Sequence, residues 1–170
     1  PPRSTPLYSS AASDVYKRQF LLLEMPRDQW VDVRPAIEEL RTCGVRLVLA
    51  HPERTPELLH EPGRIEELIQ LGCLVQVSAR SITEPRDAQT EWALRDWVRR
   101  GVVHALGSDG HSIRRRPPRI AAAVERIRHW AGAAAADRIG STIGQMVLRG
   151  LPIKVAPPAQ PSRRWWARLW

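Results

Sequence analysis

The chain has 170 residues, 43% of them hydrophobic, which is enough to bury the core of one ordinary domain. It has no run of about 18 apolar residues and no segment that reads as a secretory signal, so we expect a cytoplasmic chain without a membrane span. The net charge of +8 comes mostly from the two ends, because residues 20–150 carry 19 arginines against 17 carboxylates. Nucleic-acid binding, which needs a basic face on a folded element, is therefore a weak interpretation.

The two ends differ in composition from the middle. Residues 1–19 hold both tyrosines and one of the two lysines, and the string DVYKRQ resembles a translated adaptor sequence. We therefore expect residues 1–19 to be a non-native or disordered N-terminus. Residues 151–170 read as a Pro-rich linker followed by a basic Trp/Arg tail. We expect the tail to be disordered; the alternative is a weak contact with the anionic inner face of a membrane.

Between these ends, short apolar runs alternate with stretches of helical periodicity. The predicted strands cover residues 20–24, 45–50, 73–79 and 102–107. The predicted helices cover residues 32–43, 63–72, 90–101, 118–131 and 134–149. Apolar strands that alternate with amphipathic helices are typical of βα units around a parallel sheet. We therefore predict an α/β domain over residues 20–150 with about four βα units, half of the number in a closed (β/α)₈ barrel.

Polar side chains with useful chemistry stand where each of the four predicted strands ends. In chain order they are Glu24, His51, Ser78 with Arg80, and Asp109 with His111. The carboxyl ends of parallel strands open on one face, and that face carries the catalytic groups of α/β enzymes. One such residue is commonplace, but four consecutive strand ends with this content indicate a site.

The loop GSDGH (107–111) places Asp109 and His111 two positions apart. Carboxylates and neutral imidazoles are ligands of Mn²⁺, Zn²⁺ and Fe²⁺. An Asp-x-His pattern alone is also typical of a polar turn. Together with His51 and Glu24 at neighbouring strand ends, it favours a divalent metal site.

Arginines flank the predicted ligands. Arg54 follows one of them by three positions, and Arg114, Arg115, Arg116 and Arg119 follow another. A guanidinium binds phosphate through two nitrogens and stays charged at physiological pH. Metal ligands bracketed by arginines therefore indicate phosphoryl chemistry, while a solvated charge run is the alternative interpretation of Arg114 and Arg115.

The two cysteines, Cys43 and Cys73, are predicted to be buried, reduced thiols. Neither begins a Cys-x5-Arg loop, since the arginine would have to stand where Leu49 and Ala79 are found. The chain also lacks a Gly-rich P-loop and a G-x-S-x-G elbow. Water activated by a metal is the nucleophile that remains. Structural roles are predicted for the other histidines, His60, His104 and His129.

Five segments occur in the order and rough spacing of one enzyme family: LLLEMP, LVLAHPERT, GCLVQVSARSI, GVVHALGSDGH and RRPPRI. Over residues 20–150 the chain resembles the PHP-type, manganese-dependent protein-tyrosine phosphatases of bacterial capsule and exopolysaccharide synthesis. The resemblance implies a distorted TIM-like barrel with a metal cluster at the carboxyl ends of its strands. The implied cofactor is a divalent metal, manganese first and iron or zinc next.

The resemblance also implies roles for single residues. The implied metal ligands are Glu24, His51, Asp109 and His111, and the implied phosphate-binding residues are Arg54 and Arg116. The implied reaction is in-line attack of metal-bound hydroxide on the phosphorus of a phosphotyrosine. The implied partner is a phosphotyrosine protein, in particular a tyrosine autokinase of polysaccharide export.

One departure from the family pattern matters. The family begins with a His-x-His motif and further ligands, whereas the first histidine here is His51. We therefore expect this chain to be an N-terminally truncated fragment that is inactive or poorly folded by itself. Two alternatives stay open: a PHP-type phosphatase of small phosphomonoesters such as histidinol phosphate, and a non-catalytic regulatory or membrane-docking module.

Overall fold

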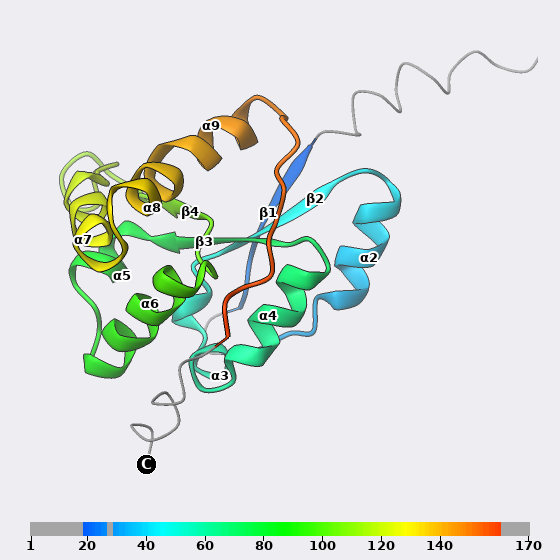
Figure 1. Ribbon diagram of the computed structural model, residues 1–170, viewed down its shortest axis with the longest axis horizontal. Helices are drawn as coiled ribbons and strands as arrows, with labels where there is room; N and C mark the ends of the chain where they lie inside the picture. The colour runs from blue at the N-terminus through cyan, green and yellow to red at the C-terminus, as the bar shows by residue number, and fades with distance from the viewer. Residues whose placement is uncertain (1–18, 27–28, 161–170) are drawn as a thin grey trace, which may run out of the picture.

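The structure, a computed structural model, describes residues 19–26 and 29–160 (Figure 1). The expectation for residues 1–18 and the expectation for the Trp/Arg tail at 161–170 lie outside these ranges. None of the helices in the described ranges is long and apolar enough to cross a membrane.

The centre of the fold is a parallel sheet, as predicted. In the order in which they pair, its strands are β1 (Phe20–Glu24), β2 (Arg46–Ala50), β3 (Leu74–Ser78) and β4 (Ala105–Gly107). Glu24 lies opposite Ala50, and Ser78 lies opposite Gly107, so neighbouring strands end close to the same level. Within the described residues the sheet is open, with β1 and β4 at its edges, and a closed barrel stays a prediction.

Helices connect the strands and follow the last one. They are α2 (Arg34–Thr42), η1 (Pro52–Arg54), α3 (Pro56–His60), α4 (Pro62–Gln70), α5 (Ala79–Thr83), α6 (Ala88–Arg100), α7 (Ala121–Ala131), α8 (Ala133–Asp137), the π-helical turn η2 (Arg138–Thr142) and α9 (Ile143–Leu148). The longest, α6, has clear end signals: the Asp87 side chain accepts a hydrogen bond from the Thr90 N–H at 2.7 Å, and Gly101 closes the helix at a φ of 79°.

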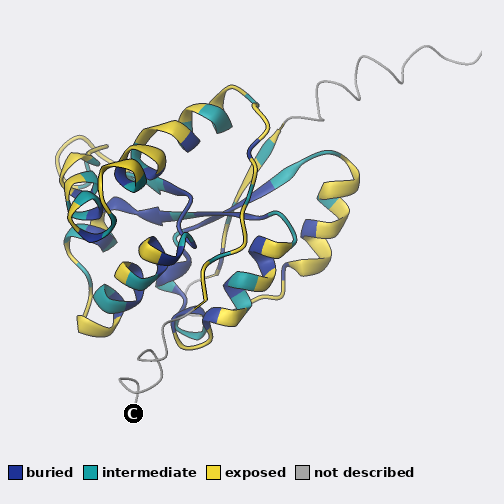
Figure 2. Cartoon of the chain, viewed as in Figure 1, coloured by how far each residue is buried: buried dark blue, intermediate teal, exposed yellow. Residues whose placement is uncertain are grey.

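The two faces of the sheet bury two apolar clusters. On one face, Leu49 and Val75 pack with the inward sides of α2, α4, α6 and α7, which contribute residues such as Trp97 and Ile127. The alternate residues of the strands, such as Val48, point to the other face and meet a smaller cluster from α9 and the segment after it. Figure 2 shows the result: β2 and β3 are buried in the middle, the edge strand β1 is largely exposed, and the helices expose their outer sides.

The segment that we expected to be a Pro-rich linker packs on the domain over residues 151–160. Ile153 is buried, and its carbonyl accepts a hydrogen bond at 2.6 Å from the guanidinium of Arg46, the first residue of β2. The Ala159 N–H donates to the Arg100 carbonyl at 2.9 Å, and the Nε of Arg100 donates to the Ala159 carbonyl at 2.7 Å. Figure 1 shows this segment crossing the sheet from α9. Its contacts are with the beginning of a strand and the end of α6, away from the carboxyl ends of the strands.

Two sequence predictions need correction. Cys73 is buried, as predicted, and burial raises the pKa of its thiol to about 12, but Cys43 is exposed at the end of α2. The predicted strand 102–107 begins only at Ala105. Val102 is buried, yet its N–H donates to the Trp97 carbonyl at 2.9 Å, because the chain is still turning out of α6 there.

Candidate active site

The backbone is unusual at two of the predicted ligands. Among the described residues other than glycine, only His51 and Asp109 have a positive φ, at 35° and 50°. Such a conformation is uncommon for residues with a Cβ and occurs where the surrounding structure fixes it, often at functional sites. His51 directly follows β2, and Asp109 stands two residues after β4. The strain therefore lies at the carboxyl edge of the sheet, where the sequence predicted a site.

His51 is held between the first three strands. Its N–H donates to the Gln76 carbonyl at 2.7 Å, and its Nε2 lies 3.2 Å from Oε1 of Glu24. Burial and the nearby charge of Arg54 lower the pKa of the imidazole, while Glu24 and Asp109 offset part of this effect. His51 is therefore a neutral imidazole at physiological pH, which is the form that binds metals.

Asp109 receives two arginines. Its Oδ2 accepts hydrogen bonds from Nη2 of Arg54 and from Nη2 of Arg116. Burial alone would raise the pKa of Asp109, whose side chain is 13% exposed, but the bond from Arg54 and the charges of Arg54 and Arg116 outweigh it and lower the pKa. The arginines remain 41% and 35% exposed, and within the described residues each guanidinium donates a hydrogen bond through Nη2 alone.

A tight turn fixes the position of Arg116. The hydroxyl of Ser112 accepts from the N–H groups of Arg115 and Arg116, each at 3.0 Å, and the Arg116 carbonyl accepts from the N–H of His111 at 3.0 Å. The side chain of His111 is not part of this arginine cluster. Its Nδ1 bonds to the backbone carbonyl of Asp109 at 2.8 Å, and its side chain is 62% exposed.

A cavity of about 400 Å³ opens beside these groups. Its walls include Glu24, His51, Arg54 and Arg116 among the predicted residues, and Glu53, Arg80, Ser81, Glu84 and Arg86 in addition. A second cavity of about 260 Å³ adjoins it and contains Asp109. The structure therefore brings five of the six predicted site residues to one pair of cavities, and His111 is not among the residues that line either cavity.

Sequence reasoning missed Glu53. Its side chain is 2% exposed, and its Oε1 accepts from the N–H of Ser78 at the end of β3 at 2.9 Å. Its Oε2 is buried and has no hydrogen-bond partner in the described part of the chain. Burial raises the pKa of Glu53, although the hydrogen bond from the Ser78 N–H and the charge of Arg54 lower it in part. The available signal was its position: a carboxylate three residues after a buried strand, between His51 and Arg54, which the sequence analysis did identify.

The predicted metal ligands form two pairs. Glu24 lies beside His51, and Asp109 lies beside His111, with Arg54 reaching from the first pair to the second. In the ranges that the structure describes, no group of three or more His, Cys, Asp or Glu side chains is placed to hold a metal ion. The metal-binding role of these four residues stays a prediction.

Comparison with known proteins adds named relatives. Tyrosine-protein phosphatase CpsB of Streptococcus agalactiae serotype III (strain NEM316) is 26% identical over 137 residues, which are 77% of this chain and 56% of that protein. Tyrosine-protein phosphatase YwqE of Bacillus subtilis (strain 168) is 25% identical over 119 residues, 65% of this chain and 47% of that protein. The chain thus spans about half the length of the curated relatives it matches.

A solved structure has the same fold. It comes from the work described as "Crystal structures of YwqE from Bacillus subtilis and CpsB from Streptococcus pneumoniae, unique metal-dependent tyrosine phosphatases". The TM-score is 0.75 at 24% identity, over 92% of this chain and 67% of that one. The family model described as "Capsular polysaccharide synthesis, CpsB/CapC" matches residues 5–149. The chain therefore belongs to the CpsB/CapC family of capsular polysaccharide synthesis.

Proposed function

We propose that the protein serves as a metal-dependent phosphotyrosine-protein phosphatase. The observation that carries this proposal is the convergence of Arg54 and Arg116 on one carboxylate, beside the Glu24–His51 pair. Two half-exposed guanidiniums that share one carboxylate have donors to spare for a further anion. Relatives that are named tyrosine-protein phosphatases support the same conclusion.

Arg54 and Arg116 would bind the phosphate group of the substrate. Their charges would also offset the negative charge that the non-bridging oxygens carry in the transition state. Asp109 positions both arginines through its Oδ2, and the Ser112 turn holds the backbone of Arg116. The pair is therefore organised before a substrate arrives, which reduces the cost of binding.

The donor set fits a divalent ion in kind. Glu24, His51, Asp109 and His111 would hold it, because metals bind neutral imidazoles and ionised carboxylates; the lowered pKa values of His51 and Asp109 favour these forms. When bound, such an ion supplies Lewis-acid stabilisation of the phosphoryl oxygens. We propose that the ion is manganese, with iron or zinc as alternatives. We also propose that the sheet forms part of a TIM-like barrel.

The proposed substrate is a phosphotyrosine protein, such as a tyrosine autokinase that controls polysaccharide export. Capsular polysaccharide synthesis, the process for which the family is described, supports this choice. Because phosphotyrosine is made from ATP inside the cell, we propose that the protein works in the cytoplasm, at the inner face of the membrane.

The test compares a phosphotyrosine peptide, the matching phosphoserine peptide and histidinol phosphate. Binding and Mn²⁺-dependent release of phosphate are both measured, since binding to the arginines does not require turnover. We expect the phosphotyrosine peptide to bind most tightly and any hydrolysis to need the metal. A preference for histidinol phosphate would replace this proposal with a small-molecule phosphatase. Binding that is indifferent to phosphate would refute both and leave a non-catalytic module.

A further inference from the structure

The second cavity, of about 260 Å³, adjoins the first and shares part of its wall. Arg80, Glu84 and Arg116 line both cavities. A molecule whose phosphate lies against Arg116 in the first cavity therefore has the second cavity directly beside it. None of the roles proposed above for phosphate binding or for a metal uses the far wall of this second cavity.

The charge of the second cavity is not balanced. Four arginines line it, Arg80, Arg115, Arg116 and Arg119, against two carboxylates, Glu84 and Asp109. Both carboxylates are already engaged: Glu84 accepts from Arg80 at 3.0 Å, and Asp109 accepts from Arg54 and Arg116. The guanidiniums of Arg115 and Arg119 make no hydrogen bond or ion pair with another residue in the described ranges. Arg115 and Arg119, both exposed, therefore place two unpartnered positive charges at the wall of the cavity.

The backbone that carries these two arginines is constrained. The Ser112 hydroxyl accepts from the N–H of Arg115, and the N–H of Arg119 donates to the Pro117 carbonyl at 2.8 Å. Between them, Pro118 packs so closely on Gly110 that a Cβ added to that glycine would stand 3.1 Å from the Pro118 Cα. Apart from Thr83 and Ser108, the rest of the wall is apolar and includes Ile120 and the first turn of α7, which has no acidic residue. The aliphatic part of a side chain fits against such a wall, and its charged end meets the arginines.

We propose that this cavity is a second anion subsite, which binds an acidic group of the peptide substrate close to the phosphotyrosine. The acidic group is a carboxylate of an Asp or Glu residue or a second phosphate, both of which arginine recognises with paired hydrogen bonds. This inference rests on the proposed phosphotyrosine phosphatase function. It adds that the enzyme selects phosphotyrosines with an acidic neighbour.

The test uses three labelled peptides of one sequence and measures their dissociation constants by fluorescence anisotropy at low ionic strength. One peptide has a phosphotyrosine with neutral neighbours, one has aspartates beside it, and one has a second phosphotyrosine beside it. We expect at least one of the two anionic peptides to bind about tenfold more tightly than the neutral one, the gain typical of a hydrogen-bonded charge. The arm that shows the gain identifies the acidic group.

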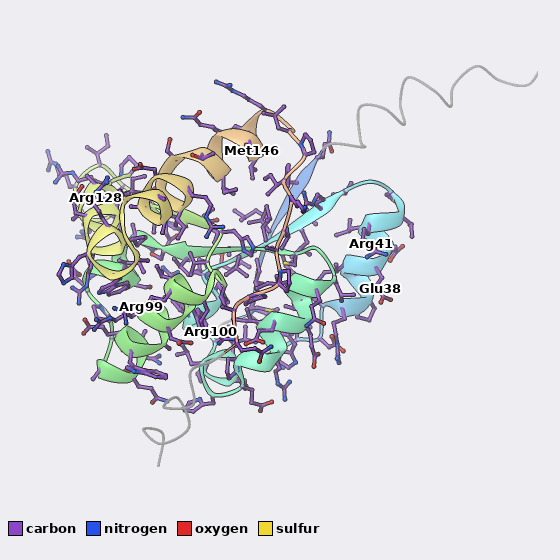
Figure 3. The ribbon with its side chains drawn as sticks, viewed as in Figure 1. Glu38, Arg41, Arg99, Arg100, Arg128 and Met146 are labelled. Atoms are coloured by element: carbon purple, nitrogen blue, oxygen red, sulfur yellow. The ribbon has the colours of Figure 1, made fainter. Side chains whose placement is uncertain are left out.

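The Arg115→Ala/Arg119→Ala variant should remove this preference and leave the affinity for the neutral phosphopeptide unchanged. The matched control is Arg41→Ala/Arg149→Ala, which removes the same charge from exposed positions outside both cavities; Figure 3 shows Arg41 on α2. The control should keep the preference, and the melting temperature of each variant shows that it is folded. A wild-type protein without any preference, or a preference that survives Arg115→Ala/Arg119→Ala, would overturn the subsite.

The proposed function can fail separately. If an unphosphorylated acidic peptide binds as tightly as its phosphorylated form, or if Arg54→Ala leaves the affinity for the neutral phosphopeptide unchanged, the phosphotyrosine site is refuted and the subsite with it. If Arg54→Ala weakens every phosphopeptide while Arg115→Ala/Arg119→Ala changes no ratio of affinities, the phosphotyrosine site stands and only the second subsite is refuted.

Discussion

Two arginine–carboxylate clusters of this protein have opposite balances of charge. In the first, Arg100 at the end of α6 binds Glu66 and Asp96, the latter at 3.3 Å, and donates to the Ala159 carbonyl at 2.7 Å. One arginine, 5% exposed, therefore faces two carboxylates and a carbonyl. Figure 3 shows Arg100 beside the C-terminal segment. This cluster is closed, and its donors are used by the protein itself.

In the second cluster, Arg54 and Arg116 share the single carboxylate of Asp109 and remain partly exposed. Here the arginines outnumber the carboxylate, so donors are left for a ligand. Burial and the ratio of charges, rather than the presence of an ion pair, therefore separate a structural arginine from a binding arginine.

The largest effect is expected for Arg100→Ala. It leaves the carboxylates of Glu66 and Asp96 partly buried without their arginine, which in buried ion pairs costs about 3–5 kcal/mol of unfolding free energy. Urea denaturation measures the loss. The control is Arg99→Ala, one residue earlier on α6. Among the described residues, the exposed side chain of Arg99 bonds only to the Trp130 carbonyl, at 2.9 Å, so its loss should cost less than about 1 kcal/mol. Equal losses for the two variants would contradict the closed-cluster interpretation.

The second prediction concerns His104, a buried histidine. Its Nδ1 accepts a hydrogen bond from the Val75 N–H at 3.1 Å, and burial, with the charges of Arg138 and Arg46, lowers its pKa to about 4. In the unfolded chain His104 has its ordinary pKa of 6.5. The stability that neutral His104 contributes is therefore present above pH 6.5 and is lost as the pH falls toward 4. The loss is about 3 kcal/mol.

Urea denaturation at several pH values between 7 and 4 measures this effect. His104→Gln keeps an acceptor for Val75 but cannot be protonated in this range, so its stability should depend less on pH than that of the wild type. His129→Gln, which changes an exposed imidazole, should keep the wild-type dependence. If the pH dependence of His104→Gln equals that of the wild type, His104 does not titrate as described.

The fold was predictable where burial follows a period. β1, β2 and β3 and the long helices follow from apolar runs and helical stripes. The single-turn helices α3 and α5 are too short to show a period, so the sequence did not reveal them. The apolar side chains of Val102 and Val103 predict a strand. In the structure both are buried, but their N–H groups bond to Trp97, which shows that apolarity reports burial rather than strand pairing.

The site was predictable as far as topology determines it. Residues after parallel strands meet at one edge, so Glu24, His51 and Asp109 could be brought together without a structure. The direction of a side chain in a loop could not be predicted in this way. The Nδ1 of His111, for example, bonds to the nearby backbone carbonyl of Asp109. The role of Glu53 could not be predicted from the sequence either, because its partner Ser78 is 25 residues away and the hydrogen bond depends on how two loops pack.

The third prediction concerns the open cluster. Arg54→Ala or Arg116→Ala should weaken binding of a phosphotyrosine peptide by about 10- to 100-fold, the range for hydrogen bonds to a charged group. Unfolding free energy should fall by less than about 1 kcal/mol, because the arginine that remains still pairs with Asp109 and both arginines are partly exposed. Anisotropy and urea denaturation, measured on the same samples, give the two values. A large loss of stability with unchanged binding would make this cluster structural, like that of Arg100.

The smallest effect on stability is expected at Glu53. Burial raises its pKa above the unfolded value, so Glu53 contributes most below the unfolded pKa, and that contribution is lost as the pH rises through the folded pKa. Glu53→Gln retains an oxygen for the Ser78 N–H and cannot ionise. At pH 7 the variant should therefore melt at a slightly higher temperature than the wild type, and this gain should disappear near pH 4. A variant that is less stable than the wild type at pH 7 would mean that a group at the buried Oε2 stabilises the ionised carboxylate. A cation in the cavity that Glu53 and Arg54 both line would be such a group.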